Sequence, residues 1–199
     1  MKILAATFNP HKIQELKALF PAHEILSPSE LGIAQLDIEE DGDSYFANAM
    51  IKAKVLWEIA RIPTLADDSG LSVKALGGAP GIHSARYGSN GGGQGLSQKE
   101  KNERLLGEMR GVENRECAFF CCLVLVTGDD SFVSVQETCP GLLAEKAQGE
   151  GGFGYDPLVY LPELDATVAQ LPPELKNRVS HRGKAARLLD GILSNIFGG

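Results

Sequence analysis

Short apolar runs alternate with amphipathic and polar segments along the chain, a pattern typical of an α/β protein. The run Lys2–Ala6 indicates a short central strand, and the uncharged run Ala118–Val126 indicates a buried one. Gly128–Asp130, between Arg115–Thr127 and Ser131–Thr138, predicts the turn of a β-hairpin. Further strands are expected at Thr64–Ala66, Leu71–Leu76, Gly141–Lys146 and Leu158–Leu161.

Apolar residues at helical spacing predict several helices between these strands. Asn9 is a good N-cap residue and Pro10 suits the first helical position, so one helix should start there and run through Phe20. Others are expected from about Ser44 to Arg61, from Ser97 to Met109, and at the end of the chain through about Phe197. In the second of these, the expected buried stripe is Phe46, Ala49, Met50, Ala53, Leu56, Trp57 and Ala60, with Asn48 and Lys52 on a more polar face.

Composition and charge narrow the class of protein. The 199 residues are enough for one domain or two closely joined lobes, and 43% of them are apolar, as in soluble globular proteins. The net charge of −7 argues against a nucleic-acid surface, and the chain shows no membrane span or targeting segment. The four cysteines form no C-x-x-C pair, so we expect buried, reduced thiols in a cytoplasmic protein rather than a zinc site.

Two adjacent carboxylates, Asp67 and Asp68, follow the apolar stretch that ends at Ala66. Neighbouring side chains on a strand point to opposite faces, so the two acids cannot share one role. At a strand end, one carboxylate could enter a cleft to hold a divalent cation or activate water, while the other turns back to the scaffold. The segment Asp67–Gly70 is also good turn chemistry, and from these residues alone both interpretations stand.

Other chemically active residues favour the first interpretation. They are the positive donors Lys12, Lys52, Lys176 and Arg182, the acids Glu40, Asp67 and Asp68, and the aromatic Phe153 in a glycine-flanked loop. Lys12 lies in the first turn of a helix that follows a strand and a tight loop, an arrangement that attracts anions. Cations, a metal-competent acid cluster and a ring for stacking together predict a site for a nucleotide polyphosphate with its magnesium ion.

Five segments in order carry a resemblance to a known family: Ala6–Lys12, Ala66–Gly70, Gly77–Tyr87, Gly151–Pro157 and Ser180–Arg182. They span nearly the whole chain, which in these segments resembles the inosine/xanthosine triphosphate pyrophosphatases. The resemblance implies a single domain over residues 1–199, with an elongated α/β fold built on a long mixed sheet and two lobes around a central nucleotide cleft. It also implies a homodimer and cleavage between the α and β phosphates, which yields a nucleoside monophosphate and pyrophosphate.

The resemblance also assigns roles to individual residues. Asp68 would activate water and, with Glu40, bind Mg²⁺, whereas Asp67 would either complete the outer shell of the metal or anchor the strand. The substrate would be bound by Thr7, Phe8, Asn9, Pro10, His11 and Lys12 at the phosphates, with Lys52 and Ser69 nearby. Phe153 would stack on the purine, and the residues expected around the base are Gly154, Tyr155, Asp156, Lys176, Ser180, His181 and Arg182.

The chemistry of the base fits a preference for XTP, ITP and dITP. Xanthine and hypoxanthine present a 6-keto oxygen, which accepts a hydrogen bond where adenine presents a donating amino group. A buried donor aimed at that position would reject adenine, because the donor would be left unpaired. The expected role is removal of deaminated purine nucleotides from the nucleotide pool. Alternatives are a pyrophosphatase for modified pyrimidine nucleotides and a nucleotide-binding protein without catalysis.

Three features of this chain depart from the pattern of the resembled family. They are Glu150, where a small or hydroxylated residue is common, His83, where an aromatic is common, and the glycine-rich run Asn90–Gly95. None falls on a residue with a predicted catalytic role, although Glu150 lies beside the loop expected to contact the base.

Overall fold

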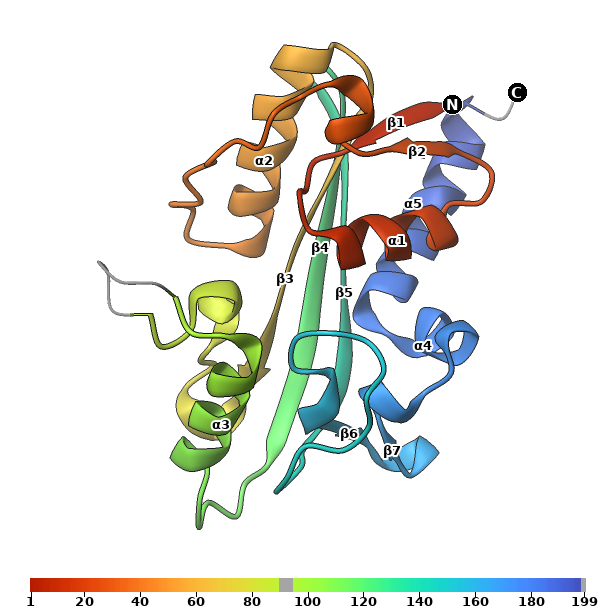
Figure 1. The fold of residues 1–199 in the computed structure, drawn as a ribbon. Coiled ribbons are helices and arrows are strands. Elements are labelled where there is room, and N and C mark those ends of the chain that lie inside the picture. Colours follow the sequence, from red (N-terminus) through yellow and green to blue (C-terminus); the bar gives the residue numbers. More distant parts are fainter. Residues whose placement is uncertain (90–94, 198–199) are drawn as a thin grey trace. The chain divides into compact units, whose positions relative to one another are not determined.

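A computed structural model describes residues 1–89 and 95–197, so the run Asn90–Gly95 lies, except for Gly95, outside the described residues. The strands are β1 (Lys2–Ala5), β2 (Glu24–Leu26), β3 (Thr64–Val73), β4 (Glu116–Gly128), β5 (Ser131–Leu143), β6 (Val159–Leu161) and β7 (Ala166–Thr167). The α-helices of the described residues are α1 (Pro10–Leu19), α2 (Tyr45–Ala60), α3 (Gln98–Glu108), α4 (Pro173–Val179) and α5 (His181–Phe197). Figure 1 shows these elements.

The strands form a seven-stranded sheet in the order β2-β1-β3-β4-β5-β6-β7. Strand β1 runs parallel to β2 and β3, whereas β5 is antiparallel to β6 and β6 is antiparallel to β7. The predicted mixed α/β sheet is therefore confirmed. The chain divides into two compact units, the first made of residues 1–68, 121–137 and 181 onward, the second of residues 69–120 and 138–180.

The first unit has an apolar layer on each face of its strands, built by strict alternation along them. In β1, Ile3 packs with α1 and α5, whereas Leu4 packs with α2. Strand β4 repeats the pattern, with Leu123 on the α1 and α5 face and Val124 on the α2 face. Because both faces are covered, these strands read as continuous apolar runs in the sequence.

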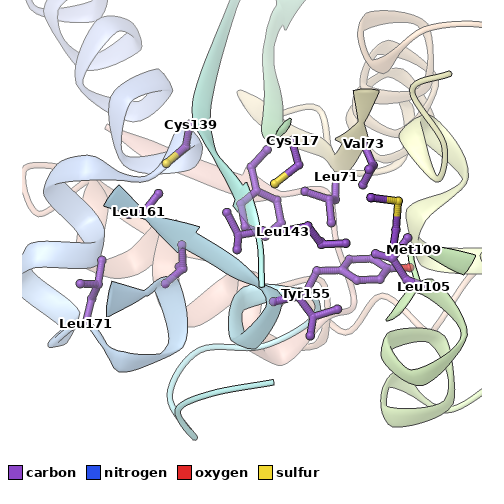
Figure 2. Packing of buried hydrophobic residues seen from close by; sticks show 14 residues of the cluster. Leu71, Val73, Leu105, Met109, Cys117, Cys139, Leu143, Tyr155, Leu161 and Leu171 are labelled. Carbon is purple, nitrogen blue, oxygen red and sulfur yellow. The ribbon is translucent and has the colours of Figure 1, made fainter. Parts of the chain in front are cut away.

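The second unit has its own core, around the distal halves of β3, β4 and β5 (Figure 2). Leu71 of β3 and Leu105 of α3 are fully buried there. Tyr155 packs in the same cluster although it comes from a loop, and its ring lies beside Leu105 in Figure 2. Cys117 and Cys139 are two of its smaller members, and all four cysteines of the chain are free and buried, as predicted.

Several predicted boundaries were wrong. The strands expected at Thr64–Ala66 and Leu71–Leu76 are one strand, β3, so the acid pair lies within a strand and not at its end. The strand expected at Gly141–Lys146 is instead the end of β5. The pattern missed β2, β7 and α4, which are only two to seven residues long, too short for a clear period.

Helix α2 starts next to Ser44, about where it was expected, and Ser44 caps it, but its predicted buried face was partly wrong. Phe46 is 40% exposed, and its ring packs against that of Phe132. Asn48, predicted on a polar face, is buried, because its Oδ1 accepts a hydrogen bond from the backbone N–H of Gly42 at 2.9 Å. The amide therefore fixes the loop that carries Glu40.

In the part of the chain that the structure describes, no helix has the length and apolarity needed to span a membrane.

Helix α3 begins with a capping box. The hydroxyl of Ser97 accepts from the backbone N–H of Glu100, and the Glu100 carboxylate accepts from the backbone N–H of Ser97 at 2.7 Å. We expect Ser97→Ala to lower the free energy of unfolding by about 1 kcal/mol, because helix N–H groups lose their partner. Urea titration measures the change, with the exposed strand residue variant Ser134→Ala as control. A loss equal to that of the control would contradict the prediction.

Candidate active site

The acid pair of β3 is split between the two faces of the sheet. Leu65 belongs to the apolar layer under α1 and α5, and Ala66 to the layer under α2. Alternation then places Asp67 on the α1 and α5 face and Asp68 on the α2 face. The ion pairs of the two acids agree with this placement, because Asp67 contacts Lys12 of α1 whereas Asp68 contacts Lys52 of α2. The expectation that the two acids have separate surroundings is confirmed.

Asp67 is the centre of a buried ionic cluster. Its Oδ1 accepts from Lys12 Nζ at 2.7 Å, and its Oδ2 accepts from Arg182 Nε at 2.5 Å. The thiol of Cys121, 3.5 Å from Oδ2, is a further donor, and Arg182 also donates to Glu15 of α1. The cluster thus ties together β3, β4, α1 and the first turn of α5.

The neighbouring charges in this cluster shift the pKa values of Asp67 and Cys121. Burial works against the charged form of Asp67, but the Arg182 guanidinium and the Lys12 ammonium outweigh it, and the pKa of Asp67 lies well below its usual range. Burial and the Asp67 charge raise the pKa of the Cys121 thiol well above its usual value, which keeps the thiol protonated as a donor. Arg182 and Lys12 therefore hold Asp67 in its charged form.

Asp68 has a different environment. Lys52 Nζ donates to Asp68 Oδ1 at 2.7 Å and to Glu40 Oε2 at 2.8 Å, so one ammonium holds two carboxylates. Burial raises the pKa of Asp68, although Lys52 works the other way. Burial also works against the charged form of Glu40, but Lys52 outweighs it and the pKa of Glu40 is lowered. Burial and Lys52 thus shift the pKa values of the two carboxyls in opposite directions, upward for Asp68 and downward for Glu40.

One oxygen of Asp68 suits a cation. Its Oδ2 is buried and accepts no hydrogen bond from any described residue, an uncommon state for a carboxylate oxygen. Among the described residues, no three His, Cys, Asp or Glu side chains are grouped to hold a metal ion. A site of two carboxylates, Asp68 and Glu40, fits Mg²⁺, which usually takes one or two protein carboxylates and fills its other positions with water and phosphate oxygens.

The predicted phosphate loop is ordered by its own side chains. Asn9 Oδ1 accepts from the backbone N–H groups of His11 at 2.9 Å and Lys12 at 3.3 Å, and Pro10 occupies the first helical position. The Asn9 N–H in turn donates to Thr7 Oγ1 at 3.1 Å. The predicted cap is confirmed, and it brings Thr7, the N-terminus of α1 and Lys12 together beside Asp67.

The second unit carries the glycine-rich loop of residues 151–156. Asp156 Oδ2 accepts from the backbone N–H of Phe153 at 2.8 Å and from Lys176 Nζ at 2.7 Å, and both ionic side chains are buried. The ammonium of Lys176 lies 5.0 Å from the centre of the Phe153 ring, in position for a cation–π contact. Gly152 has a φ of +69°, and any side chain there would collide with Asp156, so the turn requires glycine.

The predicted site residues thus fall into three groups. The structure joins Lys12, Asp67 and Arg182 in one cluster, and Glu40, Lys52 and Asp68 in a second. In the second unit it joins Phe153, Asp156 and Lys176, while Ser180 ends α4 with its N–H donating to the Lys176 carbonyl at 2.9 Å. Ser69 lies in the second unit, and His181, the first residue of α5, lies buried in the first. Tyr155, predicted to contact substrate, has its side chain in the core.

Sequence reasoning missed some contributors to these groups. Glu15 lies three residues after Lys12, on the same side of α1, which was a usable signal. Cys121 lies two residues before Leu123 on β4 and so on the same face of the strand, which could also have been deduced from the sequence. A groove of about 750 Å³ in the second unit, lined by residues such as Leu106, Val112 and Arg115, contains none of the predicted site residues.

Comparisons with known proteins show the family of this chain. The model of the Ham1 family matches residues 3–191. A curated dITP/XTP pyrophosphatase of Treponema denticola is 48% identical over 93% of this chain and 94% of its own length. One from Geobacillus kaustophilus is 42% identical over 100% of this chain and 97% of its own.

Solved structures extend the match to the fold. The Ham1 protein of Staphylococcus aureus superposes with a TM-score of 0.85 at 37% identity, covering 98% of this chain and 99% of that one. A HAM1 protein from Coxiella burnetii gives a TM-score of 0.86 at 32% identity, with the same coverage. From its near-complete match in sequence and fold, this chain belongs to the Ham1 family.

Proposed function

We propose that this chain is a pyrophosphohydrolase that converts XTP, ITP and dITP to the nucleoside monophosphate and pyrophosphate, and so removes them from the nucleotide pool. Membership of the Ham1 family, whose curated relatives include dITP/XTP pyrophosphatases, supports this activity. The observation that carries the chemistry is the buried, unpartnered Oδ2 of Asp68, beside Glu40 and Lys52. Such an oxygen can bind a cation or take a proton.

We propose Mg²⁺ as the cofactor, held by Asp68 and Glu40. The cation would neutralise charge on the phosphates and make the attacking water more acidic. Lys52 holds both carboxylates in place and keeps a positive charge beside them. Asp68, whose pKa is raised by burial, orients the water and accepts its proton as the bond between the α and β phosphates breaks.

The phosphates would bind at the loop of residues 7–12. The N-terminus of α1 and the Lys12 ammonium both favour negative charge there. Asp67 serves this site by holding Lys12 and Arg182 rather than by contacting the cation, because its carboxylate is already surrounded by donors. The remaining phosphate contacts are assigned to Phe8 and His11 of the same loop and to Ser69.

Base recognition is assigned in the second unit to the loop of residues 151–156 with Lys176 and Ser180. His181 and Arg182, predicted for the same role, lie in the first unit, where Arg182 is bound to Asp67 and Glu15. Phe153 stacks on the purine, and the buried Lys176 favours keto oxygens, which accept hydrogen bonds, over amino groups, which donate them. Tyr155 acts through its buried side chain, which fixes the loop. On this account the enzyme accepts hypoxanthine and xanthine and rejects adenine.

The arrangement of the whole molecule is part of the proposal. We assign residues 1–199 to one catalytic domain. The protein would work as a homodimer in the cytoplasm, with a small-molecule substrate and without a nucleic-acid or membrane partner.

Turnover of ITP, XTP, dITP, GTP and ATP, with and without Mg²⁺ and with products identified, tests the proposal. We expect pyrophosphate from the first three substrates, far slower turnover of ATP, and loss of activity when a chelator removes the cation. Release of orthophosphate would contradict the bond assignment. Preferred turnover of modified pyrimidine triphosphates would favour the pyrimidine alternative, and tight binding without turnover would favour the non-catalytic one.

A further inference from the structure

The loop of residues 151–156 is fixed by several elements of its own unit. The N–H of Gly151 donates to the carbonyl of Ala169 at 3.0 Å, and the hydroxyl of Tyr155 donates to the carbonyl of Ser84 at 3.0 Å. Between them, the carbonyl of Gly154 accepts from Asn102 Nδ2 of α3 at 3.2 Å. This last bond links a side chain of α3 to the backbone of Gly154, the residue that follows Phe153.

The orientation of the Asn102 amide is itself determined. Gln98, four residues earlier and one turn back on α3, donates from Nε2 to Asn102 Oδ1 at 2.9 Å. Because Oδ1 accepts this bond, the amide nitrogen is the end that faces Gly154. The capping box of Ser97 and Glu100 holds the turn of α3 on which both amides stand.

The backbone of Gly154 is one that such a hydrogen bond can restrict. Its φ of +67° is in the left-handed region, and a side chain placed there would meet nothing within 4 Å. Glycine is the least restricted residue, so the backbone at this point has many conformations to lose. A hydrogen bond to its carbonyl selects one of them and sets the direction of the Gly154–Tyr155 peptide, one residue after Phe153.

We propose that Asn102 is a positioning residue that sets the conformation of the base-recognition loop. The inference rests on the proposed function, in which Phe153 stacks on the purine. Asn102 does not touch the substrate; it acts through the Gly154 carbonyl. Its loss therefore weakens substrate binding and blurs selection of the base, while the hydrolytic group of Glu40, Lys52 and Asp68, in the other unit, keeps its contacts.

The test is Asn102→Leu, which keeps the approximate side-chain volume and removes both hydrogen bonds of the amide. We expect the KM for ITP to rise roughly 3- to 10-fold at nearly unchanged kcat, the effect of one lost hydrogen bond on binding. The kcat/KM preference for ITP over GTP should fall. Gln98→Leu, which removes only the orienting bond, should give a smaller change of the same kind, and Glu103→Gln on the exposed side of α3 should give none.

Hydrogen exchange of the free protein provides a readout that does not require activity. In Asn102→Leu, peptides covering residues 149–157 should exchange faster, while peptides of the first unit exchange at the wild-type rate. Unchanged loop exchange, or an unchanged KM for ITP, would overturn the inference. So would an equal loss of kcat on every substrate with a lowered unfolding midpoint, which indicates a role in folding alone. If wild-type protein hydrolyses no ITP, the proposed function fails instead, and the exchange rates alone decide whether Asn102 fixes the loop.

Discussion

Asp68→Asn is expected to lower kcat for pyrophosphate release from ITP about a thousandfold. Asparagine keeps the size of the side chain but loses the negative charge, so it neither takes a proton from water nor binds a cation strongly. The affected atom is Oδ2, which has no hydrogen-bond partner among the described residues and is therefore available for both roles. Steady-state assays with a pyrophosphate-specific readout measure kcat, and equilibrium binding of ITP should change far less than kcat.

The control for this variant is Asp130→Asn in the exposed hairpin turn between β4 and β5. It makes the same chemical change away from the site and should retain full activity. Urea titration of each variant establishes that the protein assayed is folded, since Asp68 also holds Lys52. A folded Asp68→Asn protein whose kcat falls less than tenfold would contradict the assignment of Asp68 as the base.

The sequence pattern predicted those parts of the fold that local chemistry decides. Asn9 and Pro10 predicted the start of α1, because a helix end is determined by the residues that bond its first N–H groups. Helix α2 was expected from about Ser44, which caps it in the structure. Alternation along a strand predicted that Asp67 and Asp68 have different surroundings. A strand end was predicted at the pair because two adjacent charges interrupt the apolar run. In the structure β3 continues through both residues, and each carboxylate forms an ion pair on its own face of the sheet.

What the pattern could not predict are contacts between distant segments. Arg182 meets Asp67 across 115 residues and Glu15 across 167. Asn102 meets Gly154 across 52 residues. No local period encodes such pairs. The burial of Asn48 is a related failure, since an amide is expected at the surface unless a specific backbone group, here the N–H of Gly42, requires it inside.

The structure also explains why the phosphate loop and the first turn of α5 depend on one carboxylate. Lys12 stands on α1 and Arg182 on α5, and in the first unit both donate to Asp67. Without Asp67, the largely buried Lys12 and the buried Arg182 would lose the anion that they share, and Arg182 would keep only Glu15 of the anions described above. Asp67 is thus the anion that Lys12 and Arg182 share, and Glu15 is a second partner of Arg182.

Asp67→Asn is accordingly expected to lower the free energy of unfolding by about 3–5 kcal/mol, the usual loss when one partner of a buried ion pair is removed. The carboxylate side chain is fully buried, so water cannot replace the lost charge. Urea titration at neutral pH measures the effect. Adding Lys12→Met should restore part of the stability, because one of the uncompensated cations is then gone, and the double-mutant cycle gives the coupling between the two residues.

The matched control is Glu116→Gln, which breaks the exposed ion pair of Glu116 with Lys74 in the second unit. Both side chains of that pair are more than half exposed, so its loss should change the free energy of unfolding by less than about 1 kcal/mol. If Asp67→Asn lost no more than this control, the cluster would not stabilise the fold. The other assignment of Asp67, an outer-shell partner of the cation, would then be favoured, since it predicts lost activity at nearly unchanged stability.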